Sequence, residues 1–241
     1  MIQLYQFPIS HFCEKVRWAL AFKKLDYKAC NLLPGPHIKK VMSVAKKSEV
    51  PVLIHNESAI QGSVNIIDYL DKTFEDNQLT PIDAETKAQA LAWEKFVDKE
   101  VGVNLRSFFY HTLLEHPSIL IPIFAQNGPW YGRVLMKFMF PALRKKMISY
   151  MRLNDKTAAQ AKLKLKQAID KINQHLSENK FLAGDEFSRA DLSAAALLAP
   201  LVQPEAYGVK WPSPLPANLQ ATADEWRDEL VWVRKMYENY R

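Results

Sequence analysis

The chain has 241 residues, 48% of them hydrophobic and 24% charged, which is the composition of a globular protein with one large or two modest domains. Cys13 and Cys30 are its only cysteines, so a disulfide framework is excluded, and no paired Cys/His spacing indicates a metal site. A net charge of +6 is too small to indicate nucleic-acid binding. Polar residues interrupt the first strand, so no apolar secretory signal is visible there. We therefore expect a cytoplasmic protein.

Residues 2–20 predict a buried strand, a tight turn and an amphipathic helix. Ile2 and Leu4 alternate with polar Gln3, as in a strand, and a helical 3-4 spacing of apolar residues begins at Phe12. Ser10 lies where the helix N-cap belongs, beside unpaired backbone N–H groups and the positive end of the helix dipole. An anion, including a thiolate, is stabilised at such a position.

The segments up to residue 77 predict an α/β domain. After the first helix we expect a strand over 27–32, a short helix over 36–44, a hairpin of strands over 52–54 and 58–61, and a helix over 63–74. This order is βαβαββα, and the change from a crossover to a hairpin predicts a mixed sheet with helices on both faces. The polar, proline-containing residues 78–84 are expected to be a linker.

Residues 85–241 predict an all-helical domain. Two apolar stripes at helical spacing predict amphipathic helices, one carrying Leu165, Ile169, Ile172 and Leu176 and the other Trp226, Leu230, Val233 and Tyr237. Between them, Ser188 and Asp191 form a capping box, bracketed by Phe187 and Leu192. The apolar run 193–201 then predicts a central buried helix.

An insertion over 117–154 contains six Lys or Arg residues, several aromatic residues and no Asp or Glu. A solvated helix face with a buried aromatic side is the simpler interpretation, and contact with a membrane surface or an anionic ligand is the alternative. The segment is longer than a compact connection needs, so we expect a cap over a ligand cleft. Its apolar side chains would suit a hydrophobic ligand, and they are Phe124, Trp130, Tyr131, Met136, Phe138 and Met139.

Together these segments resemble the soluble glutathione transferases. The resemblance rests on residues 2–20, the strand Val50-Pro51-Val52-Leu53, the helix headed by Ser63 and the capping box at 187–192, which occur in the family's order. It implies a thioredoxin-like N-terminal domain that binds glutathione as co-substrate, an all-helical C-terminal domain that supplies the electrophile site, and a homodimer. Within the family the pattern is most similar to the serine-type theta- and zeta-like classes.

The resemblance identifies Ser10 as the catalytic serine, whose hydroxyl would donate a hydrogen bond to the glutathione sulfur. Cys13 is the alternative, because a thiolate in the first helical turn is stabilised and permits mixed-disulfide chemistry. Other classes of the family use a tyrosine near the end of the first strand, but Gln6 occupies that place. Tyr5 is then expected to be a packing residue of the strand.

The resemblance also assigns four further residues to the glutathione site. His37 resembles the histidine that contacts the glycine carboxylate, with Lys39 and Lys40 adding positive charge nearby. Val50 would offer its backbone N–H and C=O to the cysteinyl part, and Pro51 is expected to follow a cis peptide bond. Ser63, at a helix N-terminus, would bind the γ-glutamyl carboxylate.

Gly62 and Glu49 depart from the family pattern. Gly62 shares the γ-glutamyl end of the site with Ser63, but the family commonly has Glu or Asp there to hold the peptide's ammonium group. Glu49 precedes Val50, where a theta-like enzyme carries a lysine for the glycine carboxylate. Losing a charge-assisted contact costs ~1.5–3 kcal/mol, so we expect reduced affinity or an ammonium contact through Gln61 or a dimer partner.

The expected function is therefore conjugation of glutathione to a hydrophobic electrophile. A binding or adaptor protein that kept this fold is one alternative, and a thiol oxidoreductase that uses Cys13 is another.

Overall fold

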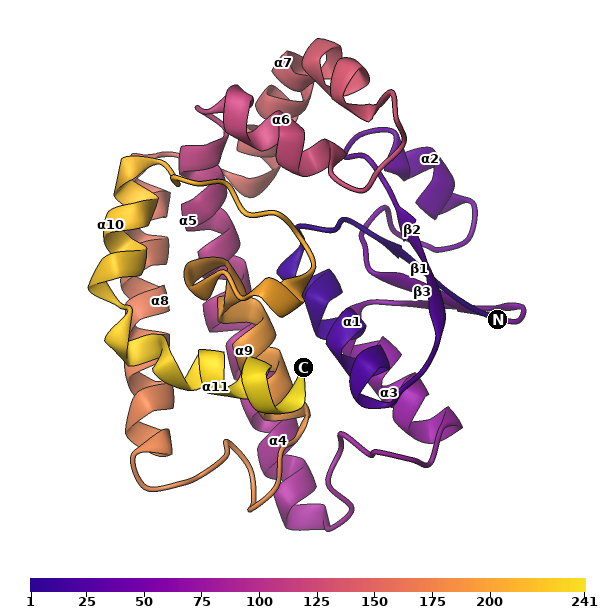
Figure 1. The fold of residues 1–241 in the computed structure, drawn as a ribbon, viewed down its shortest axis with the longest axis vertical. Coiled ribbons are helices and arrows are strands. Elements are labelled where there is room, and N and C mark those ends of the chain that lie inside the picture. Colours follow the sequence, from indigo (N-terminus) through magenta and orange to yellow (C-terminus); the bar gives the residue numbers. More distant parts are fainter.

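The structure is a computed structural model that describes residues 1–241, and Figure 1 shows a small sheet with its helices beside a larger group of helices. The four strands lie in the order β2-β1-β3-β4. They are β1 (Ile2–Gln6), β2 (Tyr27–Asn31), β3 (Val52–His55) and β4 (Ser58–Gln61). β2 is parallel to β1, whereas β3 is antiparallel to β1 and β4 to β3. The predicted order βαβαββα and the mixed sheet are confirmed.

Helices cover both faces of this sheet. α1 (His11–Phe22) and α3 (Ser63–Thr73) pack together on one face, where Leu4 and Leu53 join the main core. α2 (His37–Met42) covers the other face, where Val41 packs with Tyr5 and Val52. Successive strand residues point to opposite faces, so Leu4 and Tyr5 serve different cores. Tyr5 is a packing residue, as the sequence predicts.

The remainder of the chain is helical. Its helices are α4 (Ala84–Val97), α5 (Val103–Leu113), α6 (Pro117–Ala125), α7 (Gly132–Met151), α8 (Asp155–Leu176), α9 (Arg189–Val202), α10 (Ala217–Glu225) and α11 (Val231–Tyr240). A π-helical turn, Asp98–Gly102, joins α4 to α5, and short 3₁₀ turns occupy Glu205–Tyr207 and Asp228–Leu230.

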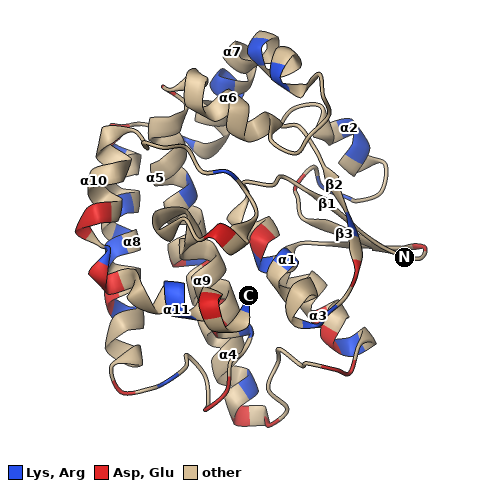
Figure 2. Cartoon of the chain, in the orientation of Figure 1, with Lys and Arg blue, Asp and Glu red and all other residues tan.

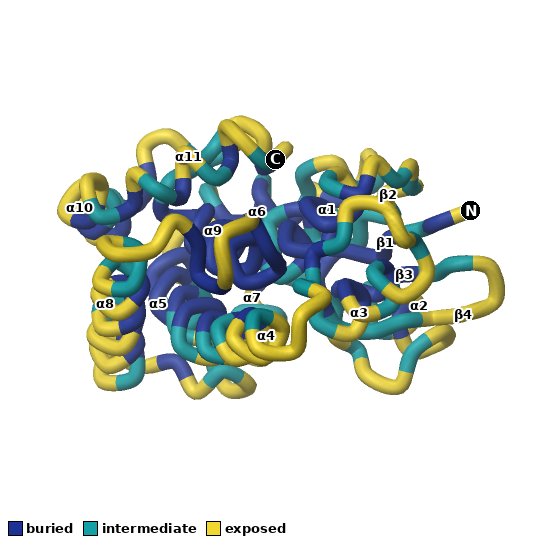
Figure 3. Tube along the Cα trace, turned by 90° about the horizontal axis from the view of Figure 1, so that it is seen from below, coloured by how far each residue is buried: buried dark blue, intermediate teal, exposed yellow.

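α9 is the central helix of this half. Residues 189–201 are all buried, and Figure 3 shows α9 enclosed among the surrounding helices. Its start is fixed by the predicted capping box. The Asp191 carboxylate accepts a hydrogen bond from the Ser188 N–H at 3.1 Å, and the Ser188 hydroxyl accepts one from the Ala190 N–H at 3.3 Å. The capping box and the buried helix are confirmed.

The last predicted helix is interrupted. Trp226, Leu230, Val233 and Tyr237 are all buried, as their spacing requires, but α10 ends at Glu225 and a 3₁₀ turn separates it from α11. The expectation of one continuous helix was wrong because an apolar stripe requires only that its members face the core. The tighter turn satisfies that requirement while redirecting the chain.

α1 is enclosed between the sheet and the helical half. Trp18 is fully buried, its ring lies 4.4 Å from that of Tyr237, and its indole N–H donates to the Tyr240 carbonyl at 2.8 Å. On the same helix, Glu14 accepts from the Arg241 Nε at 2.8 Å. The first helix is thus fixed by residues of the last one.

Buried ion pairs connect α1 to the helical half. Lys15 Nζ lies 2.8 Å from carboxylate oxygens of both Glu94 and Asp98, and Arg189 lies 2.7 Å from Glu94. Arg189 also reaches Asp68 of α3 at 2.5 Å. Buried charges are costly unless they are paired. These pairs therefore hold α1, α3, α4 and α9 in one arrangement.

α6 and α7 form the predicted insertion and pack against each other at one end of the molecule. Figure 2 shows Lys and Arg on α7 without Asp or Glu. No helix of the structure combines the length and the apolar character that crossing a bilayer requires.

Candidate active site

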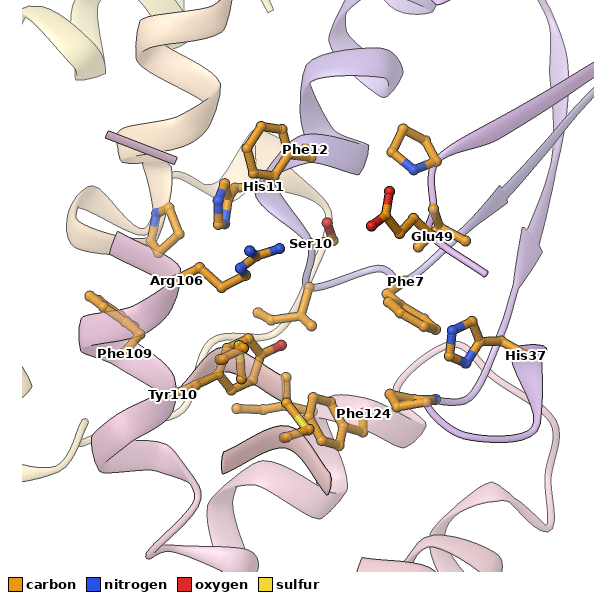
Figure 4. Close-up of a pocket in the computed structure, with 18 of the residues that line it drawn as sticks. Phe7, Ser10, His11, Phe12, His37, Glu49, Arg106, Phe109, Tyr110 and Phe124 are labelled. Atoms are coloured by element: carbon orange, nitrogen blue, oxygen red, sulfur yellow. The ribbon is translucent and has the colours of Figure 1, made fainter. Parts of the chain in front are cut away.

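A cavity of about 670 Å³ lies where the sheet half meets the helical half, and Figure 4 shows residues from both around it. The sheet half contributes the start of α1, the loop before β3 and the start of α3. The helical half contributes α5, α6, α7 and the loop before α10. Most lining residues are hydrophobic, with a few polar groups among them, which is typical of small-molecule sites.

Ser10 lies at the wall of this cavity as the N-cap of α1. Its extended backbone (φ −70°, ψ 120°) turns the side chain back over the first helical turn, where Oγ accepts from the Cys13 N–H at 3.4 Å. A hydroxyl that accepts one hydrogen bond still has its own proton to donate. Ser10 therefore presents a donor at the positive end of a helix, beside open space.

Cys13 does not reach the cavity. Its exposed fraction is 0%, and burial raises the pKa of its thiol. Gln6, at the place of the family's tyrosine, is also buried, and its side chain accepts from Arg17 at 2.9 Å and donates to Asn31 at 2.9 Å. The side chains of Cys13 and Gln6 therefore lie in the interior of the fold and do not line the cavity.

The loop before β3 presents backbone groups to the cavity. The Val50-Pro51 peptide bond is cis, as expected. The Val50 N–H and C=O make no hydrogen bond within the chain, whereas the Pro51 carbonyl accepts from the Gly62 N–H at 3.0 Å. Gln61 fixes this loop, because its amide donates to the Lys47 and Glu49 carbonyls at 2.7 and 2.8 Å. Its amide protons are therefore already engaged.

Gly62 and Ser63 lie at the start of α3, at another part of the cavity wall. Ser63 is 6% exposed, and its hydroxyl has no hydrogen-bond partner within the chain. Gly62 has φ +93°, a conformation that favours glycine. The N-terminus of α3 can bind an anion, but neither residue supplies a carboxylate.

His37 also lines the cavity. Its ring packs edge-on against Phe7 at 4.7 Å, and its Nδ1 accepts from the Gly35 N–H at 3.0 Å. Burial lowers the pKa of this imidazole, so the ring is neutral and carries its proton on Nε2. Lys39 and Lys40, expected nearby, do not line the cavity.

Glu49 is the only Asp or Glu in the cavity wall, and it accepts from the Tyr150 hydroxyl at 3.4 Å. Glu49 lies in the loop directly before Val50, at the position where the family pattern has a lysine. A carboxylate there repels rather than holds another carboxylate.

The insertion supplies part of the wall, but not with the expected side chains. Phe124 faces the cavity, whereas Trp130 and Phe138 are 94% and 82% exposed and Met136 is buried in the core. Tyr131 and Met139 do not line the cavity either. The lining side chains from α6 and α7 are instead Leu120, Ile123, Leu143, Lys146, Met147, Tyr150 and Met151. The expectation failed because composition reports aromatic content but not which helix face turns inward.

α5 carries lining residues that the sequence did not indicate. Figure 4 shows Arg106, Phe109 and Tyr110 on this helix, with the side chain of Arg106 extending toward Ser10. Beside them, His11 Nε2 lies 3.1 Å from the Gly102 carbonyl, and burial, with the nearby charge of Arg106, lowers the pKa of His11 to about 3. Burial raises the pKa of Tyr110 to about 12, so its hydroxyl keeps its proton. Their helix has no motif that marks it in the sequence.

Comparison with known families matches both halves of the chain. The glutathione S-transferase N-terminal domain matches residues 4–78, and the glutathione S-transferase C-terminal domain matches residues 134–216. A probable glutathione S-transferase of Nicotiana tabacum is 34% identical over 117 residues, which are 45% of this chain and 49% of that protein. The chain thus spans about half the length of the curated relatives it matches.

Solved structures agree over nearly the whole chain. A glutathione S-transferase domain-containing protein of Marinobacter aquaeolei has a TM-score of 0.65 at 21% identity, covering 98% of this chain and 97% of that one. A glutathione S-transferase of Methylobacterium radiotolerans, in complex with glutathione sulfonate, has a TM-score of 0.59 at 19% identity, covering 97% and 92%. The two TM-scores show a shared fold, which is a thioredoxin-like domain followed by a helical one. Since domain matches of one family cover both halves, the chain belongs to the glutathione S-transferase family.

Proposed function

We propose that this protein conjugates glutathione to a hydrophobic electrophile, and that it is a serine-type enzyme of the theta- and zeta-like kind. The observation that carries the proposal is the position of Ser10, which caps α1 at the cavity wall with a hydroxyl proton free to donate. A free thiol has a pKa near ~8.5, and a hydrogen-bond donor together with a helix N-terminus lowers it. Ser10 would thereby increase the reactive thiolate of glutathione at neutral pH.

The polar groups of the cavity fit an extended tripeptide. The γ-glutamyl carboxylate would bind the Ser63 hydroxyl and the N-terminus of α3, beside Gly62. The cysteinyl part would pair with the free N–H and C=O of Val50, at the cis bond to Pro51, as an added strand does. His37 would donate from Nε2 to the glycine carboxylate.

The apolar remainder of the cavity would hold the electrophile. Phe109, Phe124 and Leu113 belong to this part of the wall. The thiolate sulfur forms a bond to the electrophilic carbon, and in a substitution the leaving group departs with its bonding electron pair. Apolar walls strengthen the interactions of the buried sulfur, since they exclude water.

Ser10→Ala tests the proposed role of the hydroxyl. Losing a hydrogen bond to a charged group costs roughly 1.5–3 kcal/mol, so kcat/KM for glutathione and chlorodinitrobenzene should fall about 10- to 100-fold. The thiolate absorbance of bound glutathione should appear only at higher pH. Ser10→Thr keeps both the cap and the hydroxyl, and it should retain activity. Unchanged kinetics and thiolate titration in Ser10→Ala would exclude this mechanism.

A binding or adaptor protein is the second candidate, and the observation that favours it is the charge around the site. Glu49 stands where a cation is expected, and Gly62 supplies no carboxylate for the ammonium group. This function predicts that calorimetry detects no glutathione binding at millimolar concentration while an apolar dye still binds. Measurable glutathione binding with turnover would favour the enzyme.

The oxidoreductase alternative needs a reactive Cys13. Burial of this thiol and its raised pKa argue against it. After exposure to oxidised glutathione, Cys13 should carry no mixed disulfide by mass spectrometry. A glutathione adduct on Cys13 would favour the oxidoreductase.

We further propose a cytoplasmic homodimer built from domains 1–77 and 85–241 with the linker 78–84. Two free cysteines fit a reducing compartment. The absence of a carboxylate beside Ser63 fits a dimer, because a second copy would then supply the ammonium contact. Sedimentation equilibrium tests the dimer, and limited proteolysis between Thr73 and Ala84 tests the boundary.

A further inference from the structure

Arg106 is a cation without a partner in the helical wall of the cavity. No carboxylate lies within 4.0 Å of its guanidinium, and its Nε is buried without a hydrogen-bond partner. Elsewhere in the chain each buried Lys or Arg lies 2.7–3.0 Å from a carboxylate, and these residues are Lys15, Arg17, Lys23 and Arg189. Arg106 is only partly buried, but its Nε is shielded from water, and an unpaired charge is costly in such a place, so Arg106 calls for a physical explanation.

The surroundings of Arg106 provide no anion. Its neighbour His11 is neutral, because burial and the charge of Arg106 lower its pKa to about 3. Tyr110, one helical turn further along α5, keeps its hydroxyl proton, because burial raises its pKa to about 12. Glu49 is the only carboxylate of the cavity wall, and it bonds to Tyr150 of α7. Arg106 and Tyr110 therefore both present hydrogen-bond donors to the cavity, and neither carries a negative charge.

We propose that Arg106, assisted by the Tyr110 hydroxyl, binds a carboxylate on the second substrate. The inference rests on the proposed function and adds a substrate class to it: electrophiles with an apolar body and one acidic group. The apolar body would lie against Phe109 and Phe124, which line the cavity from the helical half, as Arg106 does. An arginine binds a carboxylate through two parallel hydrogen bonds, which fixes the orientation of the bound molecule.

The carboxylates of glutathione are an alternative source of the anion. The proposed pose places them elsewhere, at the start of α3 and at His37, on the sheet side of the cavity. Arg106 lies on α5, and its side chain extends toward Ser10 and away from His37 (Figure 4). The carboxylate that Arg106 binds is therefore assigned to the electrophile, and glutathione affinity serves as a control in the test.

The test compares ethacrynic acid, an unsaturated ketone with a free carboxylate, with its methyl ester. The readout is the ratio of kcat/KM for the acid to kcat/KM for the ester. A hydrogen bond to a charged group corresponds to about a 10- to 100-fold change, so this ratio should fall by that factor in Arg106→Gln, mainly through KM. Arg106→Lys should restore part of the ratio. Arg133→Gln, which removes an exposed charge on α7, should leave the ratio unchanged.

Two results would overturn the inference. One is an equal loss for acid and ester in Arg106→Gln, which would assign Arg106 to the thiolate or to the fold. The other is a weakened Kd for glutathione in the same variant, which would assign Arg106 to the glutathione subsite. A purely structural role would also lower Tm, whereas removal of an unpaired, partly buried charge should not.

A binding measurement separates this inference from the proposed function. Calorimetric titration with ethacrynic acid alone requires no turnover, and Arg106→Gln should weaken its Kd about 10-fold or more. If the wild type conjugates neither compound but shows this loss, the transferase proposal fails and the carboxylate site stands. If conjugation occurs and the acid binds both proteins equally, the carboxylate site fails and the transferase proposal stands.

Discussion

Gly62→Glu is the substitution that tests the glutathione pose most directly. It installs the carboxylate that the family commonly has before the serine, next to Ser63. The added side chain has room, because a Cβ at Gly62 would meet nothing closer than Asn65 Nδ2, at 3.7 Å. The backbone, at φ +93°, is nevertheless unfavourable for any residue with a side chain. Affinity and stability should therefore change in opposite directions.

The two magnitudes follow from separate causes. Holding a residue with a side chain at this φ costs of order 1–3 kcal/mol of unfolding free energy. The strain exists with and without ligand, so it does not reduce affinity. A charge-assisted contact with the glutathione ammonium contributes roughly 1.5–3 kcal/mol, which corresponds to about 10- to 100-fold tighter binding.

Gly62→Gln is the matched control, since it has the same backbone strain and nearly the same size without the charge. Urea unfolding should show both variants destabilised to a similar extent. Calorimetric titration with glutathione should show tighter binding only in Gly62→Glu. The reasoning is refuted if Gly62→Glu binds glutathione no better than Gly62→Gln, or if Gly62→Gln is as stable as the wild type.

Two further predictions concern a buried histidine of the cavity wall and the buried ion pairs of Arg189. Burial holds the pKa of His11 at about 3, so the stability from its neutral ring is complete above the unfolded value near ~6.5 and falls by about 1.4 kcal/mol per pH unit as pH drops below it. His11→Gln cannot titrate, and its urea midpoint should depend less on pH; parallel declines would contradict the assigned pKa. Arg189→Met leaves Glu94 and Asp68 without their arginine and should cost about 3–5 kcal/mol, measured by urea unfolding. Arg227→Met, which breaks an exposed pair, should cost less than about 1 kcal/mol, and an equal loss in both would argue against the buried network.

The sheet half could be predicted closely because its signals are local. The alternation around Leu4 and the cap at Ser10 each depend on residues only a few positions apart, and so does the capping box at Ser188 in the helical half. The structure has them where the sequence indicates. Strands and helix caps that are determined by residues close together in the sequence can be predicted without knowledge of the tertiary arrangement.

The helical wall of the cavity could not be predicted in the same way. Arg106 and Tyr110 line the same cavity as Ser10 because the start of α1 meets the π-helical turn that leads into α5, and no local motif indicates this arrangement. Trp130 and Phe138 were expected in the wall and are exposed, whereas Phe124 faces inward. Which face of a helix turns toward a cavity depends on its neighbours in space, and no single sequence displays them.

The enclosure of α1 by the last helix has a consequence for synthesis of the protein on the ribosome. Trp18 is among the first residues made, but Tyr237 and Tyr240, which cover it, are among the last. Until they emerge, an apolar face of α1 has no native partner, and contacts between such distant residues form slowly. The nascent chain should therefore need protection from aggregation for most of its elongation. The helix that the proposed catalytic serine caps completes its packing only at the end of translation.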